Sequence, residues 1–395
     1  MKILFLGYTI SKEATLNLNG VSYAGNNMQL NVLKNLVNET GMDICSITIY
    51  PIAAFPKSKK IIIRKENIQL FNNFYSVKIG FINLPILKQI LETIMVFLEA
   101  RKQIKKNNIK TVFTFNMFPQ VGLPAKWVKK LYACEIVSLV ADLPIDDSVG
   151  RKGLSKVLRD IFDYLTKSAI LECDKIIALN INAINKYAPK TPFIIVDGGV
   201  ESSDITPLKR KRNKEKNIVY TGALVEYSGI LNLIEAMKLI KDEKVVLDIY
   251  GSGQIEETIK RETKIMDNVR YHGRVDNLQV KKIQREAFLL VNPRPVDDPI
   301  SKVTFPSKIF EYMLSGTPVL TTRLNGFSEG YLDKMFFVDN NNPELLATEI
   351  NKIISLSEKE RSSIALKART YVINNKTWAK QCEKMKEFIL DQKNE

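Results

Sequence analysis

Residues 302 to 322, KVTFPSKIFEYMLSGTPVLTT, join a clear local pattern to polar residues that the pattern does not require. Four apolar residues recur here at helical spacing: Ile309, Phe310, Met313 and Leu314. Gly316 stands where the C-cap of such a helix belongs, and Pro318 opens an apolar run over residues 319 to 322. The stretch predicts a short helix that leads into a buried strand.

The polar residues of this stretch gather at the start of the expected helix. Thr304 or Ser307 can cap it, and Pro306 suits its first turn. Lys308 and Glu311 lie three apart and share a face. Free amides beside a lysine favour phosphate, and a carboxylate one turn on can accept hydrogen bonds from a ribose diol, so we predict a nucleotide site. The alternative is an exposed Lys308–Glu311 ion pair on an ordinary surface helix.

Both halves of the chain alternate β-branched apolar runs with amphipathic segments. In the first half, strands are expected at residues 2–8, 43–49, 110–115, 134–140, 175–179 and 193–196, and helices at 25–37, 86–104 and 153–171. In the second half, strands are expected at 217–221, 245–250, 269–271, 288–291, 319–322 and 336–338, and helices at 231–240, 254–263 and 345–356. Residues 53–76 break this rhythm and receive no assignment. The repetition predicts an α/β protein with two doubly wound parallel sheets and a ligand cleft at the carboxyl ends of their strands.

A change of character between residues 198 and 216 marks the expected domain boundary. A glycine turn at residues 197–200 is followed by the charged run PLKRKRNKEK at 207–216, which suits an exposed linker. We therefore expect a first domain over residues 1–200, a linker over 201–216, a second domain over 217–375, and a long amphipathic helix within 376–395.

Composition excludes several classes of protein. The chain has 395 residues, of which 45% are hydrophobic and 26% charged, as in a soluble globular protein. Four scattered cysteines and a single histidine, His272, leave too few ligands for a zinc site. The N-terminal run MKILFLGYTI is short and lacks a cleavage site, so it is expected to be a first strand rather than a signal peptide. We expect a cytoplasmic protein.

Several motifs together resemble one known family. FPSK (305–308), EYM (311–313) and SGTPV (315–319) resemble the donor-site helix of the family 4 glycosyltransferases, in the bacterial polysaccharide branch. Four further pieces follow the order of that family: NIVYTG (217–222) with SGI (228–230), DIYGSG (248–253), NVRYHGR (268–274) and NPR (292–294). A single glycine turn is weak evidence, but the combination is specific.

The resemblance implies a fold and a reaction. The fold is GT-B, with two Rossmann-like domains facing a central cleft and a C-terminal helix that crosses back to the first domain. The implied reaction is sugar transfer with retention of configuration from a nucleotide sugar, expected to be a UDP-sugar, without a further cofactor. Because the chain has one histidine and no Asp-x-Asp motif, we expect no metal in catalysis. The product would belong to a cell-surface polysaccharide such as a capsule or exopolysaccharide.

The resemblance also assigns residues to the donor. Lys308, the amides that begin at Ser307, and Arg294 are expected at the diphosphate, where charge develops on the leaving group. Glu311 is expected at the ribose. The base would meet the backbone around Gly273 and Arg274. Glycine turns are expected to approach the donor at four positions: Gly20, Gly222, Gly251 and Gly273.

Asp142 joins Lys308 and Glu311 as a candidate catalytic residue. It follows the expected strand at 134–140, roughly where relatives present a histidine or an acid toward the transferred sugar. Asp142 is equally suited to a helix cap or a turn, and the loop around Gly20 is equally an ordinary strand-to-helix loop. His272 stands on a strand beside a glycine turn and is expected to be structural.

Three positions depart from the family pattern. Val303 stands where many members carry the first of two glutamates. Ala223 and Ser228 stand where many carry an arginine and a lysine that grip the diphosphate. These departures support an alternative function, a non-catalytic partner or chaperone subunit of another glycosyltransferase. A sugar-nucleotide epimerase is a further alternative, but its expected histidines are missing.

The acceptor is expected at the first domain, which carries most of the positive charge. Residues 1–200 have a net charge of +11, out of +15 for the chain. Basic residues flank apolar ones at 57–65, 101–110 and 126–130, which suits an anionic membrane surface and a lipid-linked or oligosaccharide acceptor. The alternative is that these residues are solvated faces over a buried core. No nucleic acid is expected, since acidic residues are interspersed and no binding module is present.

Overall fold

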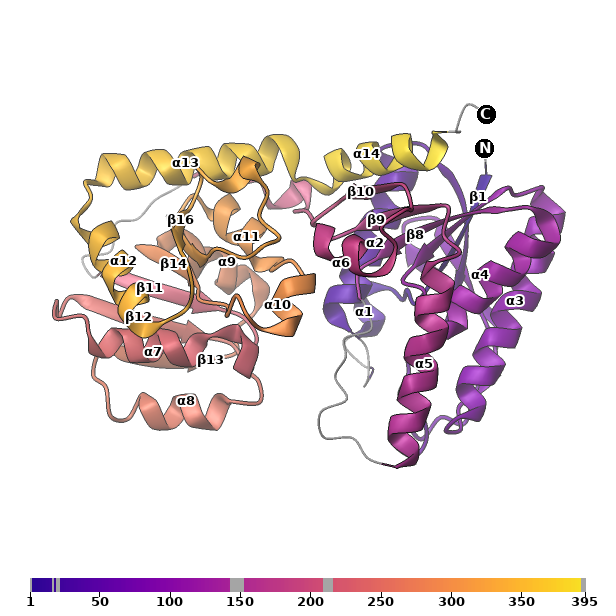
Figure 1. Ribbon diagram of the computed structural model, residues 1–395, viewed down its shortest axis with the longest axis horizontal. Helices are drawn as coiled ribbons and strands as arrows, with labels where there is room; N and C mark the ends of the chain where they lie inside the picture. Colours follow the sequence, from indigo (N-terminus) through magenta and orange to yellow (C-terminus); the bar gives the residue numbers. More distant parts are fainter. Residues whose placement is uncertain (1, 16–17, 19–21, 143–152, 209–215, 392–395) are drawn as a thin grey trace. The chain divides into compact units, whose positions relative to one another are not determined.

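The computed structural model describes residues 2–15, 18, 22–142, 153–208 and 216–391, and the chain divides into two compact units (Figure 1). Unit 1 comprises Met1–Asp197 and Trp378–Glu395, and unit 2 comprises Gly198–Thr377. The sequence placed these boundaries at residues 200 and 376. Residues 209–215 of the expected linker lie outside the described residues. The expected cleft between the two units stays a prediction.

Unit 1 is built on a sheet of eight strands in the order β10-β9-β8-β7-β1-β2-β5-β4. All neighbours are parallel except β4 and β5. The strands are β1 (Lys2–Gly7), β2 (Asp43–Thr48), β4 (Glu66–Phe71), β5 (Phe74–Lys78), β7 (Thr111–Phe115), β8 (Glu135–Val140), β9 (Lys175–Ala178) and β10 (Phe193–Ile195). A separate antiparallel pair joins β3 (Ile62–Ile63) to β6 (Phe81–Ile82). The unassigned residues 53–76 therefore supply β3, which belongs to the separate pair, and β4, which adds an antiparallel edge to the parallel sheet.

Helices cover both faces of this sheet, as the alternation of strands and helices predicts. Their bounds are α1 (Lys12–Thr15), α2 (Tyr23–Asn38), α3 (Leu87–Asn107), α4 (Pro119–Tyr132), α5 (Leu154–Ile170), α6 (Ile181–Tyr187) and α14 (Trp378–Leu390). The core on one face includes residues of α3, α4 and α5, and the core on the other includes residues of α2 and α14. The C-terminal helix therefore packs on unit 1, as expected from the resemblance.

Unit 2 is a parallel sheet of six strands in the order β13-β12-β11-β14-β15-β16. Its strands are β11 (Lys216–Thr221), β12 (Val245–Tyr250), β13 (Val269–Gly273), β14 (Leu289–Asn292), β15 (Val319–Thr322) and β16 (Phe336–Val338). Its helices are α7 (Ile230–Lys238), α8 (Glu256–Glu262), α9 (Asn277–Glu286), α10 (Pro299–Val303), α11 (Lys308–Ser315), α12 (Pro343–Ser355) and α13 (Glu358–Asn375), with the single turns η1 (Ser202–Asp204), η2 (Glu226–Ser228) and η3 (Glu329–Tyr331). In the part of the chain that the structure describes, no helix combines the length and apolar character needed to cross a bilayer.

The start of α11 differs from the expected cap, while its end agrees with it. Gly316 has a φ of +75°, the left-handed C-cap predicted from its place in the sequence. Ser307 precedes α11 with helical angles and makes no side-chain capping bond. Thr304 is the C-cap residue of α10, and its hydroxyl donates to the carbonyl of Ile300 at 2.7 Å. The expectation of a side-chain cap by either residue is therefore wrong, because Thr304 belongs to the preceding helix.

Candidate functional site

The carboxyl ends of β11 and β12 come together through two glycine turns. Gly222 has a φ of +148° and Gly251 a φ of +150°, which L side chains rarely adopt. A Cβ on Gly251 would lie 1.9 Å from the carbonyl oxygen of Gly222, so no larger residue fits there. The Gly222 amide donates to Tyr250 at 3.0 Å, and the Gly251 amide donates to Gly273 at 2.9 Å. Three of the expected donor glycines thus lie on adjacent turns at one edge of the sheet.

The side chain of Lys308 extends from the first residue of α11 to the first of these turns. Its Nζ lies 3.0 Å from the Tyr220 hydroxyl and 4.1 Å from the centroid of the Tyr220 ring. A Cβ on Gly222 would lie 2.8 Å from the same Nζ. The contacts of Lys308 are thus with the β11 turn, whereas the alternative interpretation paired it with Glu311. The ammonium group stands at Gly222, the residue before Ala223 in the sequence.

Tyr220 and Tyr312 fix α11 against the end of β11. The Tyr220 hydroxyl donates to the carbonyl of Ala223 at 2.8 Å. The Tyr312 hydroxyl accepts from the Thr221 amide at 2.9 Å and donates to the Thr221 carbonyl at 3.0 Å. Both tyrosine side chains are fully buried. Sequence reasoning missed these residues, although a tyrosine in an otherwise aliphatic strand end signals a hydroxyl that needs a partner.

Glu311 lies in a different environment, between α9 and α11. It lines a small pocket of about 20 Å³ together with residues of η1, α9, α11 and α13: Asp204, Lys281, Gln284, Arg285, Leu314, Ser315 and Arg369. Loss of hydration raises the pKa of the Glu311 carboxyl, and a hydrogen bond with Gln284 opposes that rise. Solvent still reaches the side chain. Gln284 also donates to the Thr221 hydroxyl at 3.0 Å, so the network that holds α11 also orients Glu311.

Arg294 forms hydrogen bonds with the segment that precedes α11. Its Nε donates to the Ser301 hydroxyl at 2.9 Å, and its Nη2 donates to the Thr304 hydroxyl at 2.9 Å. The guanidinium lies over the Tyr227 ring at 5.3 Å, and burial lowers its pKa. Arg294 therefore connects the loop after β14 to the chain that enters α11.

The turn after β13 carries the remaining donor candidates of unit 2. Gly273 ends β13 with a φ of +72°, and the exposed Arg274 follows it. The neighbouring His272 places its Nε2 2.7 Å from Asp248 on β12 and stacks on Tyr250 with a ring separation of 4.5 Å. These contacts join two adjacent strands, which fits the structural role expected for His272.

The remaining two candidates, Asp142 and Gly20, belong to unit 1. Asp142 follows β8, and its Oδ2 accepts a hydrogen bond from Asn116 Nδ2 at 3.1 Å. The Asn116 Oδ1 accepts the Asp142 amide at 2.9 Å, and burial raises the pKa of the Asp142 carboxyl. Gly20 lies outside the described residues. The structure therefore brings Ser307, Lys308, Gly222, Gly251 and Gly273 to one edge of unit 2, with Glu311 and Arg294 on the flanks of α11.

Part of the chain is similar in sequence to known glycosyltransferases. Residues 215–355 match the family model described as "Glycosyl transferases group 1". A lipopolysaccharide 1,2-N-acetylglucosaminetransferase from Salmonella typhimurium is 25% identical over 187 residues, which are 43% of this chain. The matched part spans about half the length of that relative, 47%.

Solved structures resemble the whole chain. A sucrose-phosphate synthase from Thermosynechococcus elongatus aligns with a TM-score of 0.67 at 14% identity and covers 98% of each chain. HepE from Anabaena in complex with UDP aligns with a TM-score of 0.62 at 13% identity, covering 98% of this chain and 99% of its own. At these identities the likeness establishes the fold alone.

Proposed function

We propose that the protein transfers a sugar from a nucleotide sugar to a hydroxyl of a saccharide acceptor, because residues 215–355 match the group 1 glycosyltransferase family model and the whole chain has the GT-B fold. The observation that carries this proposal is the position of the Lys308 ammonium, 3.0 Å from the Tyr220 hydroxyl at the glycine turn after β11. A cation beside closely approaching backbone turns suits a diphosphate.

Lys308 would stabilise the leaving diphosphate. Its charge stands at the Gly222 turn, so it would supply a cation next to the position of Ala223. The amides of Ser307 and Lys308 would donate to the same phosphates, because a helix N-terminus favours negative charge, whereas those of Ile309 and Phe310 donate to the carbonyls of Pro306 and Ser307. Arg294 would act mainly by positioning this helix start, since its Nε and Nη2 are bonded to Ser301 and Thr304. The donors would thus be oriented before charge develops in the transition state.

The nucleoside would extend from the diphosphate along α11 and the β13 turn. Glu311 keeps contact with solvent, and its carboxylate would accept hydrogen bonds from the ribose hydroxyls. The backbone of Gly273 and Arg274 would meet the base. UDP is the favoured nucleotide, supported by the fold shared with HepE, which binds UDP.

We further propose retention of anomeric configuration without a metal. In such a reaction the departing phosphate takes the proton of the acceptor hydroxyl on the face where the new bond forms, so the protein supplies position and charge. Asp142 would approach the transferred sugar from unit 1. The acceptor would be a lipid-linked saccharide of a cell-surface polysaccharide, used at the cytoplasmic side of the membrane.

A thermal-shift screen against UDP, GDP, dTDP and CMP sugars tests the donor. Binding raises the melting temperature in proportion to RT ln(1 + [L]/Kd), so the correct donor gives a shift that grows with concentration. Slow hydrolysis of that donor, unchanged by EDTA and lost in Glu311→Ala, is the expected activity. A β-linked product from an α-linked donor, or activity that needs added magnesium, would refute the mechanistic part.

The competing function is that of a non-catalytic partner subunit, favoured by Ala223, Ser228 and Val303. The position of Lys308 argues against that function, because it places a cation at the Gly222 turn, next to Ala223 in the sequence. Purified protein that binds the nucleotide but neither hydrolyses nor transfers any sugar would favour the partner function.

A further inference from the structure

Helix α3 in unit 1 exposes a row of apolar side chains and buries two carboxylates, although it also contributes Val96, Ala100 and Ile104 to the core. Residues spaced by four form an exposed apolar row, with these exposed fractions: Ile86 54%, Ile90 52%, Ile94 42% and Leu98 47%. The side of α3 that faces the protein carries Glu92, 3% exposed, and Glu99, 6% exposed. A helix that lies on a core normally buries its isoleucines and exposes its glutamates, so this arrangement requires an explanation.

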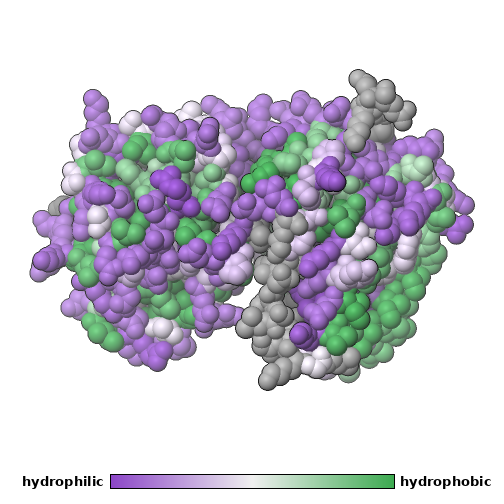
Figure 2. All heavy atoms as spheres, in the orientation of Figure 1, coloured by the Kyte–Doolittle hydropathy of each residue, from purple (hydrophilic) through white to green (hydrophobic). Residues whose placement is uncertain are grey.

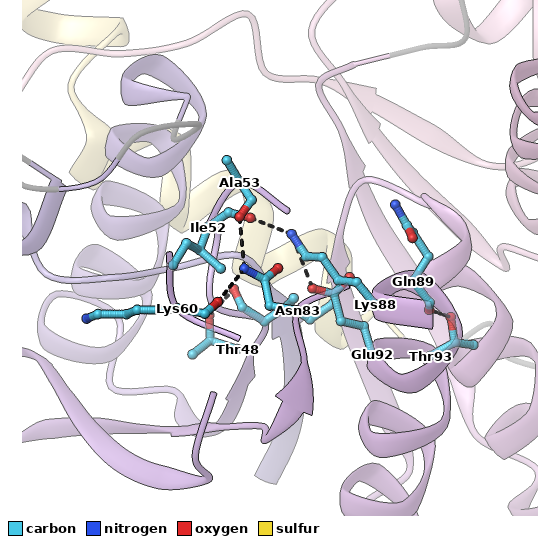
Figure 3. Close-up of polar contacts among 10 residues, drawn as sticks. Thr48, Ile52, Ala53, Lys60, Asn83, Lys88, Gln89, Glu92 and Thr93 are labelled. Carbon is cyan, nitrogen blue, oxygen red and sulfur yellow. Dashed lines mark hydrogen bonds and ion pairs between the residues drawn. The ribbon is translucent and has the colours of Figure 1, made fainter. Parts of the chain in front are cut away.

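Two lysines join α3 to the rest of unit 1. Lys65, which lies between β3 and β4, places its Nζ 2.5 Å from Glu99. Lys88 lies on α3 itself, with its Nζ 3.7 Å from Glu92, and donates to the carbonyl of Ile52. Figure 3 shows Lys88, Glu92 and Asn83 directed toward one another beneath the start of α3. Asn83 Nδ2 also donates to the carbonyls of Ala53 and Lys60, both at 2.9 Å. Rotation of α3 to bury the apolar row would break the contacts of Glu99 with Lys65 and of Lys88 with the Ile52 carbonyl, and would leave the Glu99 carboxylate without its lysine.

The exposed apolar surface continues beyond α3. Ile62 and Ile82 are register partners in the β3–β6 pair, and they are 71% and 41% exposed. Trp127 of α4 is 37% exposed and packs edge-on against Phe97 of α3, with ring centroids 5.4 Å apart. Figure 2 shows hydrophobic side chains gathered where Figure 1 places α3, α4 and α5. A contiguous apolar surface of this kind marks an interaction site. We call the residues Ile62, Ile82, Ile86, Ile90, Ile94 and Leu98 the α3 apolar surface.

Positive charge borders both ends of the α3 apolar surface. The spacing of four continues from Leu98 into Lys102 and Lys106, both exposed. At the other end, the loop before β3 and the residue after it present four exposed basic side chains: Lys57, Lys59, Lys60 and Arg64. A second copy of this chain would bring these like charges together. An anionic bilayer complements the apolar and the basic residues at once.

We infer that the α3 apolar surface inserts into the interfacial region of an anionic lipid bilayer, with Lys102, Lys106 and the basic residues before β3 at the headgroups. The inference deepens the proposed function and rests on it only for the acceptor: a lipid-linked saccharide would then be met by unit 1 at the membrane. The docking itself depends on the contacts of α3 and not on the donor site.

Co-flotation with vesicles tests the docking. The full-length protein is expected to float with vesicles of equal parts phosphatidylcholine and phosphatidylglycerol at low salt, and to remain behind with phosphatidylcholine alone. Ile90→Glu/Ile94→Glu should weaken binding more than about tenfold, since two apolar anchors are lost and two negative charges approach the headgroups. The matched control is Ile265→Glu/Leu366→Glu in unit 2, at residues that are 78% and 55% exposed, and it should float like the wild type.

Tryptophan fluorescence supplies a second measurement. The chain has two tryptophans, and Trp378 is only 6% exposed, so a shift on adding vesicles reports Trp127. Its emission should move to shorter wavelength with anionic vesicles and be quenched by brominated lipids. Lys102→Glu/Lys106→Glu should weaken binding and reduce its dependence on salt.

Three outcomes would overturn the inference. They are no flotation with anionic vesicles, equal flotation of Ile90→Glu/Ile94→Glu and Ile265→Glu/Leu366→Glu, or a dimer in light scattering that Ile90→Glu/Ile94→Glu dissociates. The last would assign the surface to a second copy. A retained UDP-induced thermal shift in Ile90→Glu/Ile94→Glu shows that the variant is folded and that the donor site is intact. Failure of docking is therefore distinguishable from failure of the proposed function.

Discussion

At the scale of single residues, the position of the Lys308 ammonium depends on the absence of a side chain at Gly222. The absence of a side chain at Gly222 leaves the space in which the Lys308 ammonium lies, and the φ of +148° keeps the turn in a shape that disfavours other residues. The motif that contains Lys308 could be recognised in the sequence, but the contact of its ammonium with the β11 turn could not. A motif records the position of a residue in the chain and not where its side chain ends.

Gly222→Ala tests this dependence. The new Cβ would lie 2.8 Å from Lys308 Nζ and would also strain the backbone, so we expect UDP to bind about tenfold more weakly. Isothermal titration gives the affinity. Gly41→Ala is the matched control, because Gly41 also has a positive φ, +68°, but a Cβ there meets no atom within 4 Å. It should lose stability and keep UDP affinity. Equal affinity in Gly222→Ala and wild type would contradict the account.

Glu92 makes the stability of unit 1 depend on pH. Burial raises the pKa of its carboxyl to about 7, and Lys88 opposes the rise. The folded state therefore holds a proton that the unfolded state releases near its ordinary value, so this stabilisation is present at low pH and is lost as the pH rises through about 7.

Glu92→Gln should remove that dependence. Relative to wild type, the variant should gain up to about 3 kcal/mol in free energy of unfolding between pH 5 and pH 8. Both tryptophans lie in unit 1, so their fluorescence during urea unfolding reports this unit. Glu39→Gln, at an exposed position, should follow the wild type. Parallel pH profiles of Glu92→Gln and wild type would show that Glu92 is not the responsible group.

At the scale of elements, α14 is the last helix of the chain and part of the core of unit 1. Four of its residues are buried against α2 and the sheet: Trp378, Cys382, Met385 and Ile389. Unit 1 is therefore completed by residues that follow all of unit 2 in the sequence.

Met385→Ala tests the contribution of α14. Met385 is fully buried, so the cavity should lower the free energy of unfolding of unit 1 by about 3 kcal/mol. Tryptophan fluorescence in urea follows the change. The exposed Glu387→Ala on the same helix should have little effect. A loss confined to the second unit would mean that α14 does not belong to the first core.

The elements were largely predictable because the parallel strands are buried on both faces and appear as continuous apolar runs. Helix α13 and the strands β3 and β4 were not assigned. Helix α13 exposes apolar residues such as Leu366, and β4 lies at an antiparallel edge, so neither shows the expected period. Helix α3 shows most clearly where prediction from the sequence ends. Its apolar period predicts the helix correctly, but not that Ile90 and Ile94 face outward.

At the site, the sequence predicted which residues matter better than how they are held. The motif around Lys308 and the three glycine turns could be recognised, because positive φ and apolar spacing are local properties. The hydrogen bonds of Tyr312 with Thr221, and of Arg294 with Ser301, join segments whose approach depends on the fold. Local pattern contains no information about such pairs.

At the scale of the whole molecule, we propose that unit 2 binds the donor and that unit 1 docks on the membrane. Unit 2 has a compact core of its own and carries Lys308, Glu311 and the three described glycine turns. Unit 1 carries most of the positive charge and the α3 apolar surface. Variants in one unit should therefore leave the measurement specific to the other unchanged.

The most direct test of the central claim is calorimetric titration of UDP into the wild type, Lys308→Met and the matched control Lys241→Met, whose lysine precedes the amino end of β12. We predict that the wild type and Lys241→Met bind UDP alike and that Lys308→Met binds at least about tenfold more weakly, a loss of about 1.4 kcal/mol. Equal affinity of Lys308→Met and wild type, or no binding of any nucleoside diphosphate by the wild type, would contradict the assignment of the donor to the start of α11.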